Sequence, residues 1–287
     1  MASLIKHDSR HPKLIALYNI PQTEQKSQAW LNQRKKYLTS SDAGTALGLN
    51  HYQKPIELLF SKCGAGEPFS GNEATRWGEK YEDEAIEHYC NAMGMKQHEF
   101  GLIPWEDVAR APDDLVIPDS HFLAGSPDGV ALPQTELEDG DPVLLEVKCP
   151  FRRKIELGQC PEHYYPQVVL NMYICNVKHA AFIEYKPAPA GQFDAMTLNI
   201  VHYERDDDWL RENIPRLKEF WGQVEYWRKN GIENHPEYKK YAWTPERIAK
   251  KVARDQAAEE KKRAAELATV KEMSAPCMLG DDSDEDD

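Results

Sequence analysis

The chain has few cysteines and no long apolar run. Its six cysteines, at positions 63, 90, 149, 160, 175 and 277, form no CxxC pair, so we expect reduced thiols and no zinc or iron–sulfur motif. Charged residues and prolines interrupt the N-terminal region, which argues against a secretory signal, and no apolar run reaches about 18 residues. We therefore expect an intracellular protein of the cytoplasm or nucleus, not secreted and with no membrane partner.

An excess of positive charge is also missing. The 287 residues contain 35 Lys and Arg but 48 Asp and Glu, and six acids stand among the last seven residues, "DDSDEDD". A basic domain is the usual sign of nucleic-acid binding, and the overall charge gives no such sign. It does not exclude nucleic acid, because a basic patch can be local and clustered carboxylates can hold divalent cations.

The order of the expected elements indicates a mixed α/β fold. Helical patterns cover residues 30–38, 39–49, 55–64, 73–94, 165–176 and 206–231, with Ser40 or Ser41 as the N-cap of the second. Strand patterns cover residues 99–104, 121–125, 128–132, 143–148, 180–186 and 196–203. We expect a leader at 1–27, a domain at 28–235 with a mixed central sheet flanked by helices, a charged helical extension at 236–279 and a disordered acidic tail at 280–287.

An acid and a base lie two residues apart in the strand pattern "LLEVKCPF". Alternate residues of a strand share a face, so Glu146 and Lys148 project together, opposite Leu145 and Val147. An exposed ion pair on an edge strand is the plain alternative. The apolar flanks oppose it, because strands of this kind are usually covered on both faces.

A second carboxylate, Asp128, stands in the turn sequence "SPDG". It could simply stabilise that turn. If strands 128–132 and 143–148 pair, however, Asp128 can reach Glu146. Two carboxylates held together need a shared proton or cation, and hard oxygen ligands suit Mg²⁺ or Mn²⁺.

A third carboxylate, Glu82, falls inside the apolar arc of the helix at 73–94, whereas Glu84 and Glu87 fall on its polar side. A half-buried carboxylate needs a partner. The alternatives are an internal ion pair with an arginine, a metal ion, or a role in orienting Lys148.

The stretch "WLNQRKKYLTSSD" suggests an anion site. Trp30 and Arg34 are neighbours on one helical face, and Ser40 and Ser41 open the next helix. Arg34 and Ser41 could hold a phosphate there. The alternative interpretation is equally plain: Arg34 lies in solvent, Trp30 lies in the core, and the two serines only cap the helix.

Taken together, "WGEKYEDEA", "SPDG", "LEVKCPF", "YYPQVVLNMYI" and "YERDDDW" resemble, in the same order, the lambda exonuclease and YqaJ-like viral recombinase family of the PD-(D/E)xK nucleases. The resemblance covers roughly residues 28–225 and extends to exonuclease-like proteins of large DNA viruses. It implies a restriction-endonuclease-like core and an Mg²⁺-dependent deoxyribonuclease. Such an enzyme digests the 5′ strand of linear duplex DNA from a phosphorylated end and releases 5′-mononucleotides.

The resemblance also implies residue roles. Asp128, Glu146 and the Val147 carbonyl would ligate two Mg²⁺ ions, for which Mn²⁺ would substitute, and Glu82 would complete that shell. Lys148 would position or deprotonate water, and Gln167 would hold Lys148 or that water. The 5′-phosphate would be gripped by Arg34 and Ser41, with Trp30 and Ser40 beside them.

Partners and alternatives follow from the same resemblance. Relatives of this kind form ring-shaped trimers and pass their 3′ overhang to a single-strand annealing protein, which makes DNA ends, that protein and a homotrimer the expected partners. The acidic loop after Asp128, the extension and the net charge depart from the phage pattern. The alternatives are an endonuclease on the same scaffold and a non-catalytic DNA-binding recombination scaffold.

Overall fold

The computed structural model describes residues 11–68, 71–112, 114–134, 140–188 and 196–273. It divides after Tyr241 into two compact units. The first unit continues past residue 235 because Tyr238 and Tyr241 pack their rings against Phe60. None of the described helices is long and apolar enough to cross a membrane.

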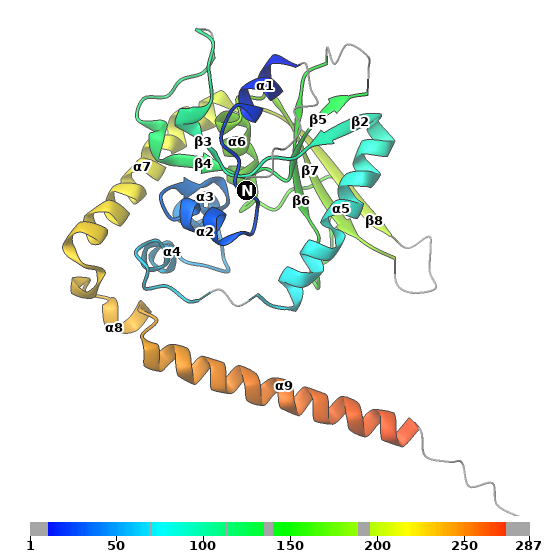
Figure 1. The fold of residues 1–287 in the computed structure, drawn as a ribbon, viewed down its shortest axis with the longest axis vertical. Helices are drawn as coiled ribbons and strands as arrows, with labels where there is room; N and C mark the ends of the chain where they lie inside the picture. The colour runs from blue at the N-terminus through cyan, green and yellow to red at the C-terminus, as the bar shows by residue number, and fades with distance from the viewer. Residues whose placement is uncertain (1–10, 69–70, 113, 135–139, 189–195, 274–287) are drawn as a thin grey trace, which may run out of the picture. The chain divides into compact units, whose positions relative to one another are not determined.

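A five-stranded mixed sheet forms the centre of the first unit (Figure 1). Its order is β2 (Met95–His98), β5 (Gly129–Pro133), β6 (Val143–Lys148), β7 (His179–Lys186) and β8 (Thr197–Glu204). The β6–β7 pair is parallel and the other three pairs are antiparallel. The mixed α/β class is thus confirmed, and so is the pairing of 128–132 with 143–148, in which Gly129 lies opposite Leu145.

The two faces of this sheet are covered by different helices. Helix α5 (Glu73–Met93) packs Ala85, Ile86 and Tyr89 against one face, which includes Leu145 and Val147. Helix α6 (Tyr165–Ile174) packs against the face that carries Leu144 and Phe182. The alternation of β6 therefore directs Glu146 and Lys148 to the side of α6.

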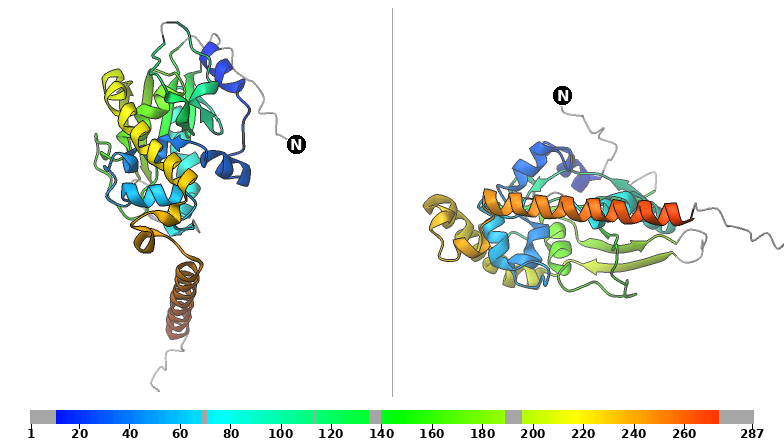
Figure 2. Two further views of the ribbon diagram at one scale, coloured as in Figure 1. Left: turned by 90° about the vertical axis from the view of Figure 1, so that its left-hand side faces the viewer. Right: turned by 90° about the horizontal axis from the view of Figure 1, so that it is seen from below.

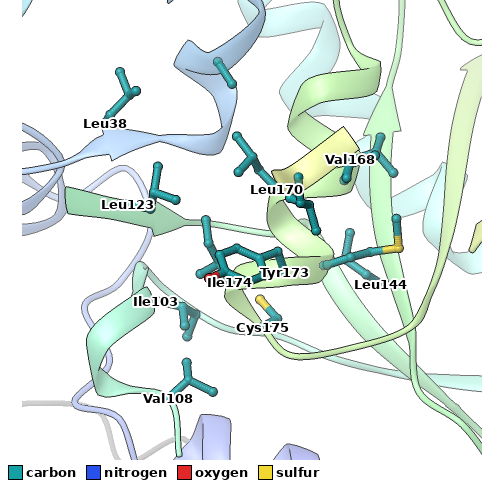
Figure 3. Close-up of a cluster of buried hydrophobic side chains, with 14 of the residues drawn as sticks. Leu38, Ile103, Val108, Leu123, Leu144, Val168, Leu170, Tyr173, Ile174 and Cys175 are labelled. Carbon is teal, nitrogen blue, oxygen red and sulfur yellow. The ribbon is translucent and has the colours of Figure 1, made fainter. Parts of the chain in front are cut away.

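A second sheet lies on the far side of α6. It consists of β1 (Leu38–Thr39), β4 (Leu123–Gly125) and β3 (Ile103–Pro104). Figure 3 shows side chains of α6 placed between Leu38 and Leu123 of this small sheet and Leu144 of the large one. Because α6 is buried on both sides, its sequence is apolar all round rather than striped.

The first unit also contains further helices and short 3₁₀ turns. They are α1 (Pro12–Tyr18), α2 (Gln28–Arg34), α3 (Ala43–Ala46), α4 (Pro55–Lys62), α7 (Asp207–Asn230) and α8 (Tyr238–Tyr241), with single 3₁₀ turns η1 (Ser40–Asp42), η2 (Trp105–Asp107), η3 (Ser120–Phe122) and η5 (Ile232–Asn234). Helix α7 contacts α3, α4 and α6, and in the left view of Figure 2 it crosses in front of the first two.

The second unit contains one long helix, α9 (Pro245–Met273). Near its start, the guanidinium of Arg247 lies 4.5 Å from the ring centre of Trp243. The predicted acidic tail at 280–287, part of the predicted leader and part of the acidic loop before β6 lie outside the described residues.

Two local predictions were wrong. Only Ile103–Pro104 of the stretch 99–104 is a strand, because Phe100 and Gly101 exchange backbone hydrogen bonds with the side chains of Gln25 and Gln22 instead of a sheet. The predicted helix 30–38 ends at Arg34, and residues 38–39 form β1.

The N-cap before α3 was also misplaced. Thr39 is the N-cap of the 3₁₀ turn η1, and Asp42 is the N-cap of α3, rather than Ser40 or Ser41. The amide and hydroxyl of Thr39 both donate to Asp42 Oδ2, over 2.8 and 2.6 Å.

Candidate active site

The end of β6 carries the first pair of polar groups. Glu146 is fully buried, and its Oε1 accepts a hydrogen bond from the ammonium of Lys148. Strand alternation places both side chains on one face, as the sequence predicted. Lys148 is half-buried, and its ammonium lies 5.3 Å from the ring centre of Tyr164 at the start of α6.

Asp128 is joined to the same strand from the turn before β5. Its Oδ2 accepts a hydrogen bond of 2.7 Å from the backbone N–H of Val147, the residue between Glu146 and Lys148. The β5–β6 pairing brings the turn beside the strand end. The structure therefore brings together the three residues that the sequence placed in one site.

The electrostatics of this group favour a further positive charge. Burial raises the pKa of Glu146 to about 7, against the attraction of Lys148 and with the help of Asp128. Burial likewise raises the pKa of Asp128. Burial lowers the pKa of the Lys148 ammonium, but the negative charges of Glu146 and Asp128 outweigh it, and the net pKa is raised.

Glu82 approaches the site from α5, on the other side of β6. It is half-buried, as the helical arc predicted, while Glu84 and Glu87 are exposed. Burial and the charge of Asp128 raise the pKa of Glu82 to about 7. Glu82 and Lys148 line a cleft of about 280 Å³, and Glu82 and Asp128 line a neighbouring cavity of about 700 Å³.

The donor set fits a hard divalent cation in its chemistry. The available ligands are carboxylate oxygens of Asp128, Glu146 and Glu82, with the Val147 carbonyl. Burial is the main cause of the raised pKa values of the three carboxyl groups, and the charge of Asp128 adds to it at Glu82 and Glu146. Among the described residues, no three His, Cys, Asp or Glu side chains are already grouped as a metal site. In this conformation Glu146 is turned to Lys148 and Asp128 to the Val147 amide.

Asn171 is the site residue that sequence reasoning missed. It is fully buried in the middle of α6, and its Nδ2 donates to Glu146 Oε2 over 3.1 Å. The signal was present, since an Asn within the apolar run "VVLNMYI" must find a polar partner. Gln167, one turn earlier, makes no side-chain hydrogen bond within the described part of the chain, so its predicted support of Lys148 stays a prediction.

The predicted phosphate residues form a second cluster. One nitrogen of Arg34, Nη2, donates to Ser41 Oγ over 2.7 Å and to Thr39 Oγ1 over 3.2 Å. The guanidinium lies 4.4 Å from the ring centre of Trp30. Ser41 is exposed, whereas Ser40 is buried and offers little surface to an anion. The following helices, η1 and α3, are only three and four residues long, so side chains rather than a helix dipole would bind the anion.

An unpredicted ion pair supports this cluster. Asp42 Oδ2 lies 2.5 Å from the ammonium of Lys62, and both side chains are largely buried. Although burial raises the pKa of Asp42, Lys62 and Arg34 outweigh it, so the carboxyl is ionised. Because the hydroxyl of Thr39 donates to Asp42, its lone pairs face Arg34 and Ser41.

The two clusters are connected through Trp30. Its indole N–H donates to Ser126 Oγ over 3.4 Å, and Ser126 precedes Asp128 in the same turn. Gln25 also donates to the carbonyl of Pro127. The segment that carries Arg34 is thus fastened to the turn that carries Asp128.

Comparison with known proteins identifies a matching family and viral relatives. Residues 29–178 match the family model of the YqaJ-like viral recombinase domain. An uncharacterized protein of Acanthamoeba polyphaga mimivirus is 30% identical over 215 residues, covering 72% of this chain and 35% of that protein. A protein of African swine fever virus is 27% identical over 158 residues, covering 50% of this chain and 44% of that protein. The chain thus spans less than half the length of these relatives.

The fold is also found in a solved structure. The alkaline exonuclease of Laribacter hongkongensis aligns with a TM-score of 0.54 and 22% identity, covering 71% of this chain and 95% of that one. A structure of the same exonuclease with dAMP aligns equally well. The predicted restriction-endonuclease-like core is thereby confirmed.

Proposed function

Because the chain belongs to the YqaJ-like viral recombinase domain family, we propose that it is a deoxyribonuclease that hydrolyses one strand of linear duplex DNA from a 5′-phosphorylated end, in the 5′→3′ direction, and releases 5′-mononucleotides. The observation that carries the proposal is the joining of Asp128, Glu146 and Lys148 at the end of β6, through the Val147 amide and the Lys148–Glu146 ion pair.

In this proposal Asp128, Glu146, Glu82 and the Val147 carbonyl hold Mg²⁺, or Mn²⁺ in its place. Two such cations, when bound, supply stabilisation of the charge that develops during phosphodiester hydrolysis. Release of Glu146 from Lys148 would free the ammonium to hold the attacking water and to stabilise the phosphate's added negative charge. Asn171 keeps the Glu146 carboxylate in place from the other side.

We propose that Arg34 and Ser41 bind the terminal phosphate. Ser41 Oγ accepts a hydrogen bond from Arg34 and lies 3.1 Å from Thr39 Oγ1, to which it donates. In the proposal the Ser41 hydroxyl turns from Thr39 and donates to a phosphate oxygen instead. Arg34 carries a fixed positive charge and stacks on Trp30, which suits it to a phosphate. The connection from Trp30 to Ser126 would set the distance from the bound end to the reacting phosphodiester.

A family member with this activity would act on DNA ends that arise in recombination or processing. A single-strand annealing protein as recipient of the 3′ overhang, and a homotrimer as the working assembly, belong to the proposal because the resemblance implies them. Both can be tested with the full chain, by co-purification and by light scattering.

A single gel tests the proposal. Purified protein and Mg²⁺ are mixed with a 5′-phosphorylated linear duplex, the same duplex with a 5′-hydroxyl, and covalently closed circular DNA. EDTA and Glu146→Ala serve as controls. Shortening of linear DNA only, fastest from the 5′-phosphate, supports the proposal. Cleavage of the circular DNA would contradict the proposal and favour an endonuclease. The absence of any cleavage would favour a non-catalytic DNA-binding scaffold.

A further inference from the structure

Four aromatic rings run from the surface to Lys148. Tyr52 and His51 have ring centres 4.2 Å apart, and both lie near His163, at 5.8 and 5.1 Å. His163 in turn lies 4.1 Å from Tyr164, whose ring centre is 5.3 Å from the ammonium of Lys148. We call His51, Tyr52, His163 and Tyr164 the ring surface.

The outer end of the ring surface is open to solvent. Tyr52 is 72% exposed, the largest exposed fraction among the large hydrophobic side chains described, and His51 is exposed as well. A single exposed aromatic residue would need no explanation. Here the exposed ring begins a continuous series whose inner end, Tyr164, lines the same cleft as Lys148 and Glu82.

The ring surface is held in position from below. The backbone N–H of Tyr52 donates to Asn50 Oδ1 over 2.9 Å, and Asn50 Nδ2 donates to Thr45 Oγ1 over 2.9 Å. Gly44 contacts the backbone of His163 so closely that a Cβ at this position would collide with the His163 carbonyl. The rings therefore sit on a packed base formed by α3 and are preorganised for a flat ligand.

Two cations, Lys148 and Arg153, lie near the inner rings, and each is paired with a buried carboxylate. Arg153 is fixed by its ion pair with the buried Glu184, and the ammonium of Lys148 lies 5.3 Å from the ring centre of Tyr164. Burial and the neighbouring His51, Arg153 and Lys148 lower the pKa of His163, so its imidazole is neutral at pH 7. Neutral flat rings bordered by fixed cations suit a ligand with both flat faces and negative charge.

We propose that the ring surface binds unpaired bases of single-stranded DNA by stacking, next to the reacting phosphodiester. The ligand class is a single strand rather than a duplex, because bases within a duplex do not expose their faces. Stacking on aromatic rings tolerates any base, which suits an enzyme that must move along arbitrary sequence. This inference rests on the proposed nuclease function for its biological meaning, but the binding can be measured without cleavage.

The test compares two strands of equal length, oligothymidylate and an abasic strand with the same phosphates. Fluorescence anisotropy with the full-length protein in EDTA measures binding while preventing hydrolysis. We expect the wild type to bind oligothymidylate more tightly. The Tyr52→Ala variant should bind it about fivefold or more weakly, with unchanged affinity for the abasic strand. Tyr52→Trp should retain the preference, and so should Tyr226→Ala, which removes another exposed tyrosine, on α7.

The inference is overturned if the wild type binds both strands equally, or if Tyr52→Ala weakens both to the same degree. If the wild type cuts linear duplex DNA but Tyr52→Ala still prefers oligothymidylate, the proposed role of the ring surface is overturned and the proposed nuclease function is not. A wild type that prefers oligothymidylate but cuts no DNA overturns the nuclease function and leaves the ring surface standing.

Discussion

Removal of the Asn171 side chain should shift the pH dependence of the enzyme. Asn171 Nδ2 donates to Glu146 Oε2 over 3.1 Å, and both residues are fully buried. The hydrogen bond favours the ionised carboxylate, so its loss raises the pKa of Glu146 further above the value of about 7. A hydrogen bond to a charged group contributes about 2 kcal/mol, which corresponds to roughly 1.5 pKa units.

This shift predicts a specific activity profile. A carboxylate must lose its proton before it binds a cation. With Asn171→Ala, the ionised fraction of Glu146 falls roughly 15-fold at pH 7 but less than about twofold at pH 9. The assay is the initial rate of digestion of a 5′-phosphorylated duplex at subsaturating Mg²⁺, between about pH 6 and 9. The acid limb of the profile should move to higher pH by about 1.5 units.

Two further variants make the result decisive. Gly125→Ala places a Cβ 2.5 Å from Asn171 Oδ1 and forces the amide away from Glu146, so it should move the acid limb in the same direction. Asn213→Ala also removes a buried amide, one that donates to the Trp209 carbonyl on α7, and should leave the limb in place. An unmoved limb in Asn171→Ala, or an equal shift in Asn213→Ala, would refute the reasoning.

The remaining predictions concern the two clusters and the fold. Lys148→Ala should abolish cleavage while DNA and Mg²⁺ binding persist; cleavage at the wild-type rate would contradict the assignment. EDTA should stop digestion and Mn²⁺ restore it, as measured on the same gel. Arg34→Ala should equalise the rates on 5′-phosphate and 5′-hydroxyl ends, Thr39→Val should reduce their ratio, and Thr39→Ser should keep it. Gly94→Ala, at φ 63°, should lower the free energy of unfolding by about 1 kcal/mol in urea; an unchanged midpoint would oppose this.

Much of the site could be predicted from local patterns. Two-residue alternation gave the common face of Glu146 and Lys148, and helical periodicity gave the half-buried Glu82, because both depend only on backbone geometry. The turn sequence and the adjacent strand gave Asp128 its neighbour. These residues lie in helices and strands or directly beside them, where the helical or strand repeat determines the direction in which each side chain points.

Other features depend on tertiary contacts that no local period encodes. Asn171 was recognisable as a buried polar residue, but its partner became clear only when α6 packed on β6. The Asp42–Lys62 pair joins a 3₁₀ turn to the end of α4, and its role in orienting Thr39 follows from that packing. Strand β2, "MKQH", is a polar edge strand, so it lacks the apolar alternation by which strands are predicted.

The location of Glu146 and Lys148 within one strand has a consequence for protein production. A slip of β6 by one residue against β5 and β7 would turn the side chains of Glu146 and Lys148 toward α5. Leu145 and Val147 would then occupy the face that carries the candidate site. Such a chain could keep its helices and much of its compactness. Circular dichroism would report the secondary structure of all folded molecules, whereas the specific activity would report only those in which β6 is paired in the native register. The ratio of the two would therefore measure the fraction of a preparation with the native register.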